Sequence, residues 1–470
     1  MQESHEHYFE EDSLYQAIAR FEDMVRSKTT SYFDVYEFEL IVDYYLDQHD
    51  FSKAEDALDI ALSQHPAAQE LKFRLAQLYI SSGKPAKGIR LLRDIEFLEA
   101  NNSDFYLLKG SALNLLGKKE EAGQAFNEAI KLSSDSKDEV IYNIALSFIN
   151  NRRYSHAIKY LKLAHEINPK NIDVIQELAL VYERIDELKL STDYYKKFLE
   201  IEPFSGSVWL SLGVLYSSLD LHEKAIDAFD FAIAIRPNNI AALFSKANTC
   251  VNWGKHNEAI KTYQEIIEFD PTNVQAYTYI GECYEKLSYF KRSIFFFKRA
   301  LSFDENYADA WYGLGIATFQ QDLIKESIEY FQKAIAIDPE NPDFWFMLGE
   351  VFRKLEDLEK AAEAFNRAVE LDPNDFEAWI CRAELSFKDN NDIKGAISIL
   401  KKAIEFNKDN STINYQLATY LFRNNQSKQA SHFFEKGLQI NFNEHNDFIE
   451  DISEKFTNRI VGELISKHRK

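Results

Sequence analysis

The chain has 470 residues, a hydrophobic content of 46% and a formal net charge of −22 at pH 7. Because a single hydrophobic core stops growing at roughly 250–300 residues, a chain of this length is either several domains or one array of repeats. The acidic balance opposes binding to nucleic acid and to anionic membranes, which need clustered Lys and Arg. We therefore expect protein or peptide partners, with basic and apolar side chains.

The composition also argues against several kinds of site. No window approaches the 18 or so apolar residues of a membrane helix, and residues 1–12 lack the apolar core of a signal peptide, so a cytoplasmic protein is expected. The three cysteines, Cys250, Cys283 and Cys381, are too few and too scattered for a disulfide framework or a zinc cluster. His5 and His7 would need further fixed ligands to hold a metal. We expect no metal and no cofactor.

Residues 1–34 form the first segment. Residues 1–12 are charged and carry no periodic apolar face, which predicts an acidic tail. Residues 13–25 place Leu14, Ala17, Ile18 and Phe21 on one face, which predicts a helix. Since the terminal units of a repeat array need a cover for their open apolar face, we expect this helix to cap the segment that follows.

Residues 35–444 repeat one pattern, seen most clearly in 308–341. Trp311, Leu314, Gly315 and Thr318 follow the spacing i, i+3, i+4, i+7 of one helix face. A second amphipathic stripe follows a short polar turn, and Pro339 then ends the second helix because proline has no amide hydrogen. The predicted repeats are 35–68, 69–102, 103–137, 138–171, 172–205, 206–239, 240–273, 274–307, 308–341, 342–375, 376–410 and 411–444.

Small residues recur at two positions of the repeat, where the two helices of a pair must approach each other closely. In the first helix they are Ala76, Gly110, Ala145, Ala179, Gly213, Ala247, Gly281, Gly315, Gly349, Ala383 and Ala418, and only Val42 departs. In the second helix they are Ala54, Gly88, Ala122, Ala157, Ser191, Ala225, Ala259, Ser293, Ser327, Ala361, Ala396 and Ala430. Residues 445–470 carry a further apolar stripe, which predicts one long C-terminal capping helix.

A pair of helices in about 34 residues, with recurring aromatic, small and proline positions, resembles the tetratricopeptide repeat (TPR). The resemblance covers residues 35–444 and implies an all-α fold, a right-handed α-solenoid of about twelve helix-turn-helix repeats. TPR arrays bind peptides or partner proteins along the surface formed by the first helix of each repeat. The resemblance therefore implies a non-catalytic interaction scaffold or adaptor, and no motif for phosphate, calcium or zinc-protease chemistry contradicts it.

Carrying the family's inward-facing positions over to this chain gives a candidate groove. Tyr142, Gln176 and Glu183 are its members in the first half of the array. The partner-binding groove predicted in the second half comprises Phe244, Asn248, Asn252, Glu282, Glu285, Tyr312, Phe346, Glu350, Arg353 and Glu384. We expect aromatic anchors ringed by carboxylates, which suit a peptide or helix with apolar and basic side chains.

Other interpretations remain open. The carboxylates of the groove are also compatible with a solvated face of an acidic protein. The family's clamp for chaperone tails uses Lys and Asn at positions where this chain has Phe244, Thr278 and Glu282 beside Asn248, so that role is not expected. An alternative function is a structural or assembly protein that self-associates into a homo-oligomer through its ends or through Phe295 and Phe296, or a regulatory subunit of a larger complex.

Overall fold

The structure is a computed structural model that describes residues 3–134, 136–452 and 458–468, and their side chains outside 3–13, 389–390, 449–452 and 458–459. Within these ranges the chain forms 27 α-helices and no β-strand. The all-α fold predicted from the sequence is confirmed. The helices fall into two compact units, residues 1–219 and residues 220–470, which we call the N-terminal and C-terminal units.

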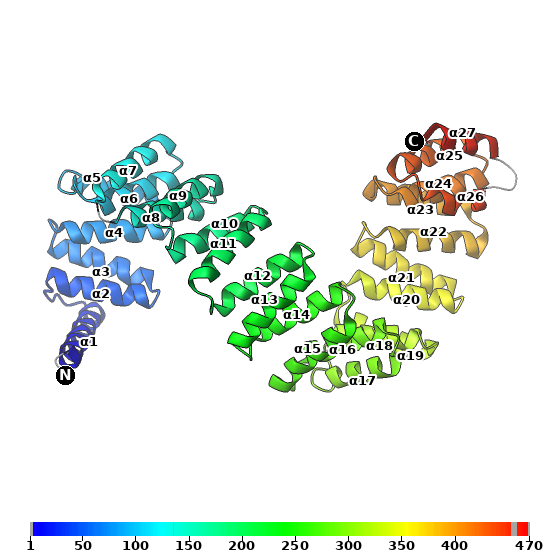
Figure 1. The fold of residues 1–470 in the computed structure, drawn as a ribbon, viewed down its shortest axis with the longest axis horizontal. Helices are drawn as coiled ribbons and strands as arrows, with labels where there is room; N and C mark the ends of the chain where they lie inside the picture. Colours follow the sequence, from blue (N-terminus) through cyan, green and yellow to red (C-terminus); the bar gives the residue numbers. More distant parts are fainter. Residues whose placement is uncertain (1–2, 135, 453–457, 469–470) are drawn as a thin grey trace. The chain divides into compact units, whose positions relative to one another are not determined.

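The helices of both units are coloured along the chain in Figure 1. The N-terminal unit contains α1 (Glu3–Ser27), α2 (Val35–Asp47), α3 (Phe51–Gln64), α4 (Gln69–Ser81), α5 (Pro85–Ile95), α6 (Ser103–Leu115), α7 (Lys119–Leu132), α8 (Lys137–Asn150), α9 (Tyr154–Ile167), α10 (Ile172–Arg184), α11 (Leu188–Ile201) and α12 (Gly206–Ser218). The C-terminal unit contains α13 (His222–Ile235), α14 (Ile240–Asn252), α15 (His256–Phe269), α16 (Val274–Lys286), α17 (Phe290–Leu301), α18 (Ala308–Phe319), α19 (Ile324–Ile337), α20 (Pro342–Lys354), α21 (Leu358–Leu371), α22 (Phe376–Asn390), α23 (Ile393–Phe406), α24 (Ser411–Arg423), α25 (Ser427–Ile440), α26 (His445–Ile452) and α27 (Asn458–His468).

Each unit is a stack of helix pairs. From α2 to α25, even-numbered helices are the first and odd-numbered helices the second helices of the predicted repeats. Every helix packs on the next one along the chain, from α1 to α12 and from α13 to α25. First helices of neighbouring repeats also touch, as α6 does with α8 and α16 with α18. This packing is that of an α-solenoid, as the sequence predicted.

The small residues sit where the two helices of a pair meet. A Cβ atom added to Gly315 would lie 2.6 Å from the ring of Phe331 on the partner helix, and one added to Gly349 would lie 2.8 Å from the ring of Phe365. The small residues of the second helices, such as Ser327 and Ala361, are fully buried. The aromatic residue of the second helix therefore fills the space that the small residue of the first helix leaves, which confirms the predicted packing.

The turn between the two helices of a pair has a left-handed residue at one fixed position. Gly117 and Gly254 have φ of +77° and +75° there, and Asp322 and Glu356 have φ of +64° and +61°. Glycine adopts this conformation without a steric penalty, whereas residues with a Cβ atom are disfavoured in it. Gly117 lies in the turn between α6 and α7.

Polar side chains fix the starts of the first helices. The side-chain oxygens of Asn171, Asn239, Asn273, Asn341 and Asn410 each accept a hydrogen bond from a backbone N–H in the first turn. These N-caps satisfy amide groups that have no partner within the helix.

In four repeats a tryptophan joins the first helix to the loop before it. The indole Nε1–H of Trp311 donates to the carbonyl of Glu305 at 2.8 Å, and that of Trp345 donates to the carbonyl of Pro339 at 2.9 Å. Trp379 makes the same bond to the carbonyl of Pro373 at 3.0 Å. The donor always lies six residues after the acceptor, so the bond recurs with the period of the repeat.

The N-terminal end differs from the sequence-based prediction. Helix α1 begins at Glu3 and not at residue 13, because helix-favouring charged residues extend it beyond its apolar face. Phe21 of α1 packs edge-to-face against Phe33 and Phe38, with ring centroids 5.8 and 6.3 Å apart. At the C-terminal end the described residues form α26 and α27, while residues 453–457 between them, with Phe456, fall outside the described ranges, so the single capping helix stays a prediction.

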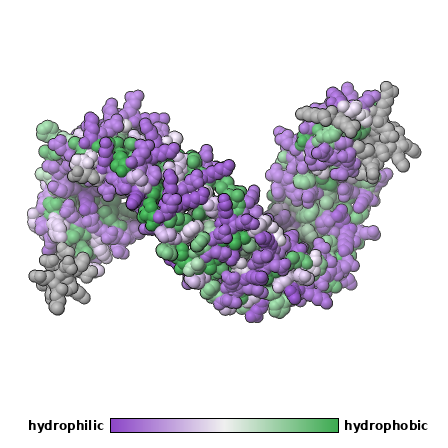
Figure 2. All heavy atoms as spheres, viewed as in Figure 1, coloured by the Kyte–Doolittle hydropathy of each residue, from purple (hydrophilic) through white to green (hydrophobic). Residues whose placement is uncertain are grey.

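Hydrophilic residues cover most of the surface visible in Figure 2, with smaller patches of hydrophobic residues among them. None of the described helices combines the length and the apolar character needed to cross a membrane.

Candidate functional site

All ten residues of the predicted groove lie on first helices of the C-terminal unit. Phe244, Asn248 and Asn252 belong to α14, Glu282 and Glu285 to α16, Tyr312 to α18, Phe346, Glu350 and Arg353 to α20, and Glu384 to α22. Side-chain contacts link α14 to α16, α18 to α20 and α20 to α22, and α16 packs on α18. We call this set and its direct neighbours the inner row.

The three aromatic residues of the inner row are half-buried. The ring centroid of Phe244 lies 6.0 Å from that of Tyr263, Tyr312 lies 5.8 Å from Phe331, and Phe346 lies 5.6 Å from Phe365. Each therefore packs on the core aromatic of its own repeat and presents only part of its ring to solvent. Tyr312 also contacts Phe344 of α20 at 4.9 Å, and Phe244 contacts Tyr279 of α16 at 6.1 Å.

Asn248 is exposed on α14 and is held by the same core. Its side-chain oxygen accepts a hydrogen bond of 2.5 Å from the Tyr263 hydroxyl, whose pKa burial raises. The amide nitrogen of Asn248 is left for a ligand or solvent. Asn252 is exposed one turn further along the helix.

Two carboxylates of the inner row are neutralised by an arginine. The guanidinium of Arg353 lies 2.5 Å from a carboxylate oxygen of Glu350 and 3.8 Å from one of Glu384. The Cys381 thiol donates to the other oxygen of Glu350 at 3.6 Å. Burial and the charge of Glu350 raise the pKa of Cys381 to about 12, so this thiol stays protonated and is not a nucleophile.

The other carboxylates of the inner row form a like-charged group. Glu282 on α16 is acted on by the negative charges of Glu285 on the same helix and of Asp309 on α18, and we call these three the acidic cluster. Solvent reaches Glu282, yet the surrounding helices partly desolvate its carboxyl, and the charges of Asp309 and Glu285 oppose its ionisation. Burial first, and then these charges, raise the pKa of Glu282 to about 7, against a smaller opposing effect of Lys286.

Neighbouring groups share this environment. Lys286 lies 3.6 Å from Glu285. Burial, followed by the charge of Asp338, raises the pKa of Asp309. Burial and the charge of Asp309 raise the pKa of Tyr307 to about 12. The sequence analysis missed Asp309 and Tyr307, although Asp309 lies in the first turn of α18, three residues before the predicted Tyr312.

The N-terminal unit has a groove of different chemistry. A cavity of about 750 Å³ is lined by the first helices α2, α4, α6 and α8. Its apolar lining is leucine-rich, with Leu46, Leu78, Leu107, Leu108, Leu115 and Leu146, and its polar lining includes Gln77, Ser111, Asn143 and Asn150. We call it the N-terminal groove. The sequence analysis proposed Tyr142 in this region and missed these residues.

A buried polar network supports one wall of the N-terminal groove. Asn114 is fully buried, and its amide donates to the backbone carbonyl of Ser147 at 3.1 Å. Its side-chain oxygen accepts from Arg153 at 3.0 Å, and its backbone carbonyl accepts from Asn151 at 2.8 Å. The network ties α6 to α8 and fixes the spacing of the groove-lining helices.

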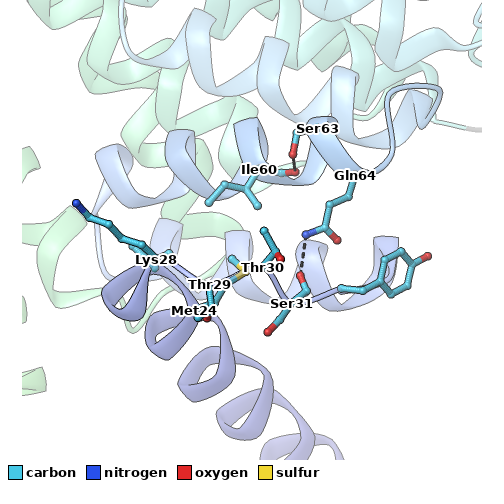
Figure 3. Close-up of a pocket in the computed structure, with 10 residues that line it drawn as sticks. Met24, Lys28, Thr29, Thr30, Ser31, Ile60, Ser63 and Gln64 are labelled. Carbon is cyan, nitrogen blue, oxygen red and sulfur yellow. Dashed lines mark hydrogen bonds between the residues drawn. The ribbon is translucent and has the colours of Figure 1, made fainter.

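A third cavity, of about 660 Å³, lies between the end of α1 and α3 (Figure 3). Gln64 spans it, donating from Nε2 to the carbonyl of Ser31 at 2.8 Å and accepting from the amide of Phe33 at 3.1 Å. Ser63 donates to the carbonyl of Ile60 at 2.6 Å. Since these polar groups bond to the chain itself, the cavity is a structural joint between α1 and the first repeat.

The described part of the chain contains no group of three or more His, Cys, Asp or Glu side chains placed to hold a metal ion. His5 and His7 lie outside the described side chains. Burial raises the pKa of Cys250 and raises that of Cys283 to about 12, so both thiols are protonated near neutral pH.

Family models match stretches over most of the array, from residue 45 to residue 445, with 172–205 not matched. Models described as "Tetratricopeptide repeat" match residues 45–112 and 308–341, and another of that description matches 103–136, 138–171, 206–239 and 274–307. A model described as "TPR repeat" matches 247–288, and the model "Cytochrome c-type biogenesis protein H TPR domain" matches 334–445. Four of the matched stretches coincide with predicted repeats at both ends, and 103–136 stops one residue short, which confirms the predicted register.

Solved structures are similar to parts of the chain. The crystal structure of MamA is 25% identical over 34% of this chain and 94% of its own, with a TM-score of 0.32. YrrB, described as a TPR protein with an unusual peptide-binding site, is 24% identical over 39% of this chain and 94% of its own, with a TM-score of 0.32. A thermophilic TPR protein of Thermus thermophilus, TTC0263, is 20% identical over 38% of this chain and 98% of its own, with a TM-score of 0.34. No protein of curated function matches this sequence.

Proposed function

Because this chain belongs to the tetratricopeptide repeat family, we propose that it is a non-catalytic scaffold that binds a peptide or partner protein along the first helices of its repeats. The family alone does not choose the ligand, so the choice rests on the side chains that the first helices present.

The observation that carries the proposal is the acidic cluster. Three carboxylates, Glu282, Glu285 and Asp309, lie together with Lys286 as the one cation acting on Glu282 in the described structure. A Lys or Arg side chain of a partner would relieve the repulsion among them and form charge-assisted hydrogen bonds. The half-buried rings of Phe244, Tyr312 and Phe346 would contact the apolar side chains of the same partner.

The Glu350–Arg353–Glu384 group has a different part in this proposal. Its charges are largely compensated within the chain at 2.5 and 3.8 Å. It therefore holds α20 and α22 together and limits where a basic ligand is attracted. Of the carboxylates predicted from the sequence, Glu282 and Glu285 are the ones that we propose to attract the partner.

The N-terminal groove would take a less charged part of the partner. Its leucines offer apolar surface, and the side chains of Gln77, Ser111, Asn143 and Asn150 offer uncharged donors and acceptors. The guanidinium of Arg74 at its edge is already paired with Asp43 at 2.6 Å. We propose that the two units bind different stretches of a partner, one apolar and one basic.

Affinity capture followed by mass spectrometry tests the proposal. The variant Glu282→Gln/Glu285→Gln/Asp309→Asn removes the negative charge of the acidic cluster. The matched control Glu326→Gln/Glu329→Gln/Glu340→Gln removes the same charge from exposed positions on and after α19. Partners that the control retains and the cluster variant loses, more strongly at low salt, support the proposal. Equal capture by both variants would contradict it.

One observation favours a second candidate, self-association. On α17, Phe296 is half-buried and stacks on Tyr284 at 5.4 Å, whereas Phe295 is 63% exposed. A homo-oligomer would bury Phe295, so sedimentation velocity of the wild type and of Phe295→Ser separates the two ideas. A concentration-independent monomer in both would rule out self-association through this residue.

A further inference from the structure

Several repeats contain a stacked pair of aromatic rings away from the inner row. One ring lies near the end of the first helix and the other lies twelve residues later in the second helix. The ring centroids are 5.4 Å apart for Phe148 and Tyr160, 5.6 Å for Tyr182 and Tyr194, and 5.4 Å for Tyr284 and Phe296, with interplanar angles of 11°, 14° and 23°.

These pairs fill the cleft between second helices of adjacent repeats. Tyr194 of α11 lies 5.9 Å from His165 of α9, and the Nζ atom of Lys162 of α9 lies 5.9 Å from the ring centroid of Tyr182. The rings are thus enclosed by α9, α10 and α11. Cations lie over them, as Lys197 does over Tyr194 at 4.5 Å and Arg292 over Tyr284 at 5.5 Å.

The repeat at 240–273 has neither ring. Cys250 and Thr262 occupy the two positions, twelve residues apart, and they are 2% and 3% exposed. A pocket of about 520 Å³ lies above them, between α13 and α15 with α14 as its floor. Ile226 of α13 and Trp253, the residue after α14, add apolar surface to its lining.

A third departure from the repeat opens this pocket further. Lys246 stands where neighbouring repeats place an aliphatic residue, such as Leu212 or Ile280. Its ammonium group is drawn to Asp230 of α13, 2.6 Å away, and leaves the aliphatic position unfilled. The pocket therefore lies where this repeat lacks the ring pair and the aliphatic residue that occupy these positions in the repeats 172–205 and 274–307. The repeat 103–137 lacks them as well, with Lys109, Leu113 and Ala125.

Lysines line the pocket, but not at the positions that carry Arg292 and Lys197 beside the rings of other repeats, which are Glu258 and Glu265 here. Lys246, Lys255 and Lys261 all line it. The Nζ atom of Lys255 lies 3.3 Å from the centroid of the Trp253 ring, which shows that a cation and an aromatic face already meet at this site. Unlike the three repeats with a stacked pair, this repeat has no aromatic ring at positions 250 and 262.

We propose that the pocket between α13, α14 and α15 binds an aromatic side chain, phenylalanine or tyrosine, of a partner protein. The ring takes the place of the pair found in the repeats 138–171, 172–205 and 274–307, packs on Cys250, Thr262 and Ile226, and receives a lysine on its exposed face. The site lies between second helices, away from the inner row, so it is independent of the function proposed for the first helices.

Ligand-observed NMR with N-acetyl-tyrosinamide tests this proposal, with N-acetyl-alaninamide as the ring-free control. We expect weak binding, on the order of millimolar, of the first compound only, because a single side chain buries little surface. Cys250→Tyr/Thr262→Tyr restores the pair, fills the pocket and should weaken this binding at least about tenfold. If circular dichroism shows that the double variant does not fold, Cys250→Phe places a single ring in the pocket instead.

The reverse exchange supplies a matched control in another repeat. Tyr182→Cys/Tyr194→Thr removes a natural pair, and it should add a second binding site of similar affinity. Failure of N-acetyl-tyrosinamide to bind the wild type would overturn the proposal, as would equal binding by the wild type and the filled variant. If free p-cresol binds and N-acetyl-tyrosinamide does not, the pocket takes a small free phenol and not a protein side chain, which would also contradict the proposal.

Discussion

The same substitution, glycine to alanine, is expected to have opposite effects on stability at two helical positions of this chain. In a helix interior alanine is favoured over glycine by about 1 kcal/mol, because glycine loses more backbone freedom on folding. At Gly123 of α7 an added Cβ atom meets no other atom within 4 Å. At Gly315 of α18 it would lie 2.6, 2.7 and 2.8 Å from three atoms of the Phe331 ring.

The contact at Gly315 outweighs the helix preference. Carbon atoms prefer separations of about 3.5–4.0 Å, so the ring or the helix must move by most of an ångström. Phe331 is fully buried and packs against Tyr312 at 5.8 Å, so it has no free direction to move. Overpacking of this kind costs about 1–3 kcal/mol. We therefore expect Gly315→Ala to lose about 1 kcal/mol overall and Gly123→Ala to gain about 0.5–1 kcal/mol.

Urea unfolding followed by circular dichroism measures both changes. Since repeats couple mainly to their neighbours, hydrogen exchange of the amides in α18 and α19 should locate the loss at Gly315→Ala. Gly349→Ala, with a closest contact of 2.8 Å to Phe365, should show a similar loss. If Gly315→Ala and Gly123→Ala stabilise the protein equally, the close approach of the two helices is not what requires glycine.

Three further predictions follow from the fold and the inner row. Trp311→Ala removes a half-buried ring that stacks on Tyr330 at 5.7 Å and donates a 2.8 Å hydrogen bond to the Glu305 carbonyl, so it should lower the free energy of unfolding by about 3 kcal/mol. A melting curve identical to that of the wild type would contradict the role of Trp311 as a link between repeats. Glu356→Gly removes the Cβ atom of a residue with φ of +61° and should raise the free energy of unfolding by about 0.5–1 kcal/mol, whereas Gly254→Ala, at φ +75°, should lower it. If urea unfolding shows that Glu356→Gly is the destabilising variant of the two, the left-handed turn position does not favour glycine. The folded-state pKa of Glu282 is about 7, above its ordinary value, so the folded protein binds more protons than the unfolded chain and its stability should fall as pH rises from about 4.5 to 7. Thermal melts of Glu282→Gln should lack this part of the decline. If the pH dependence of the melting temperature is the same in the variant and the wild type, the acidic cluster does not perturb Glu282.

The repeat register could be predicted from the sequence because the same contact is made again and again. Small residues such as Gly315 and Ser327 and aromatic residues such as Phe331 recur where helices touch, so each copy checks the others. The ends lack this support. Charged residues extend α1 to Glu3 without an apolar stripe.

The inner-row residues could be placed on the correct helices from the sequence. Which of their charges pair with one another could not be predicted from it. Arg353 and Glu384 lie 31 residues apart in sequence, and only the packing of α20 on α22 shows that they pair at 3.8 Å. The acidic cluster joins residues of two repeats, and Asp309 precedes the predicted position on α18. The sequence shows one cause of the pocket above Cys250, since Cys250 stands where the two adjacent repeats have Tyr216 and Tyr284. The volume of the pocket also depends on Thr262 and Lys246.

The indole-to-carbonyl bonds make whole repeats interchangeable units of length. Trp311 bonds to the carbonyl six residues before it, and so does Trp345. If residues 308–341 were excised, Trp345 would stand six residues after Glu305 and could take over the bond that Trp311 makes now. Excision of half a repeat would instead leave an indole N–H without its acceptor. An array built in this way can lose or gain a complete helix pair without losing the indole-to-carbonyl hydrogen bond where the chain is rejoined.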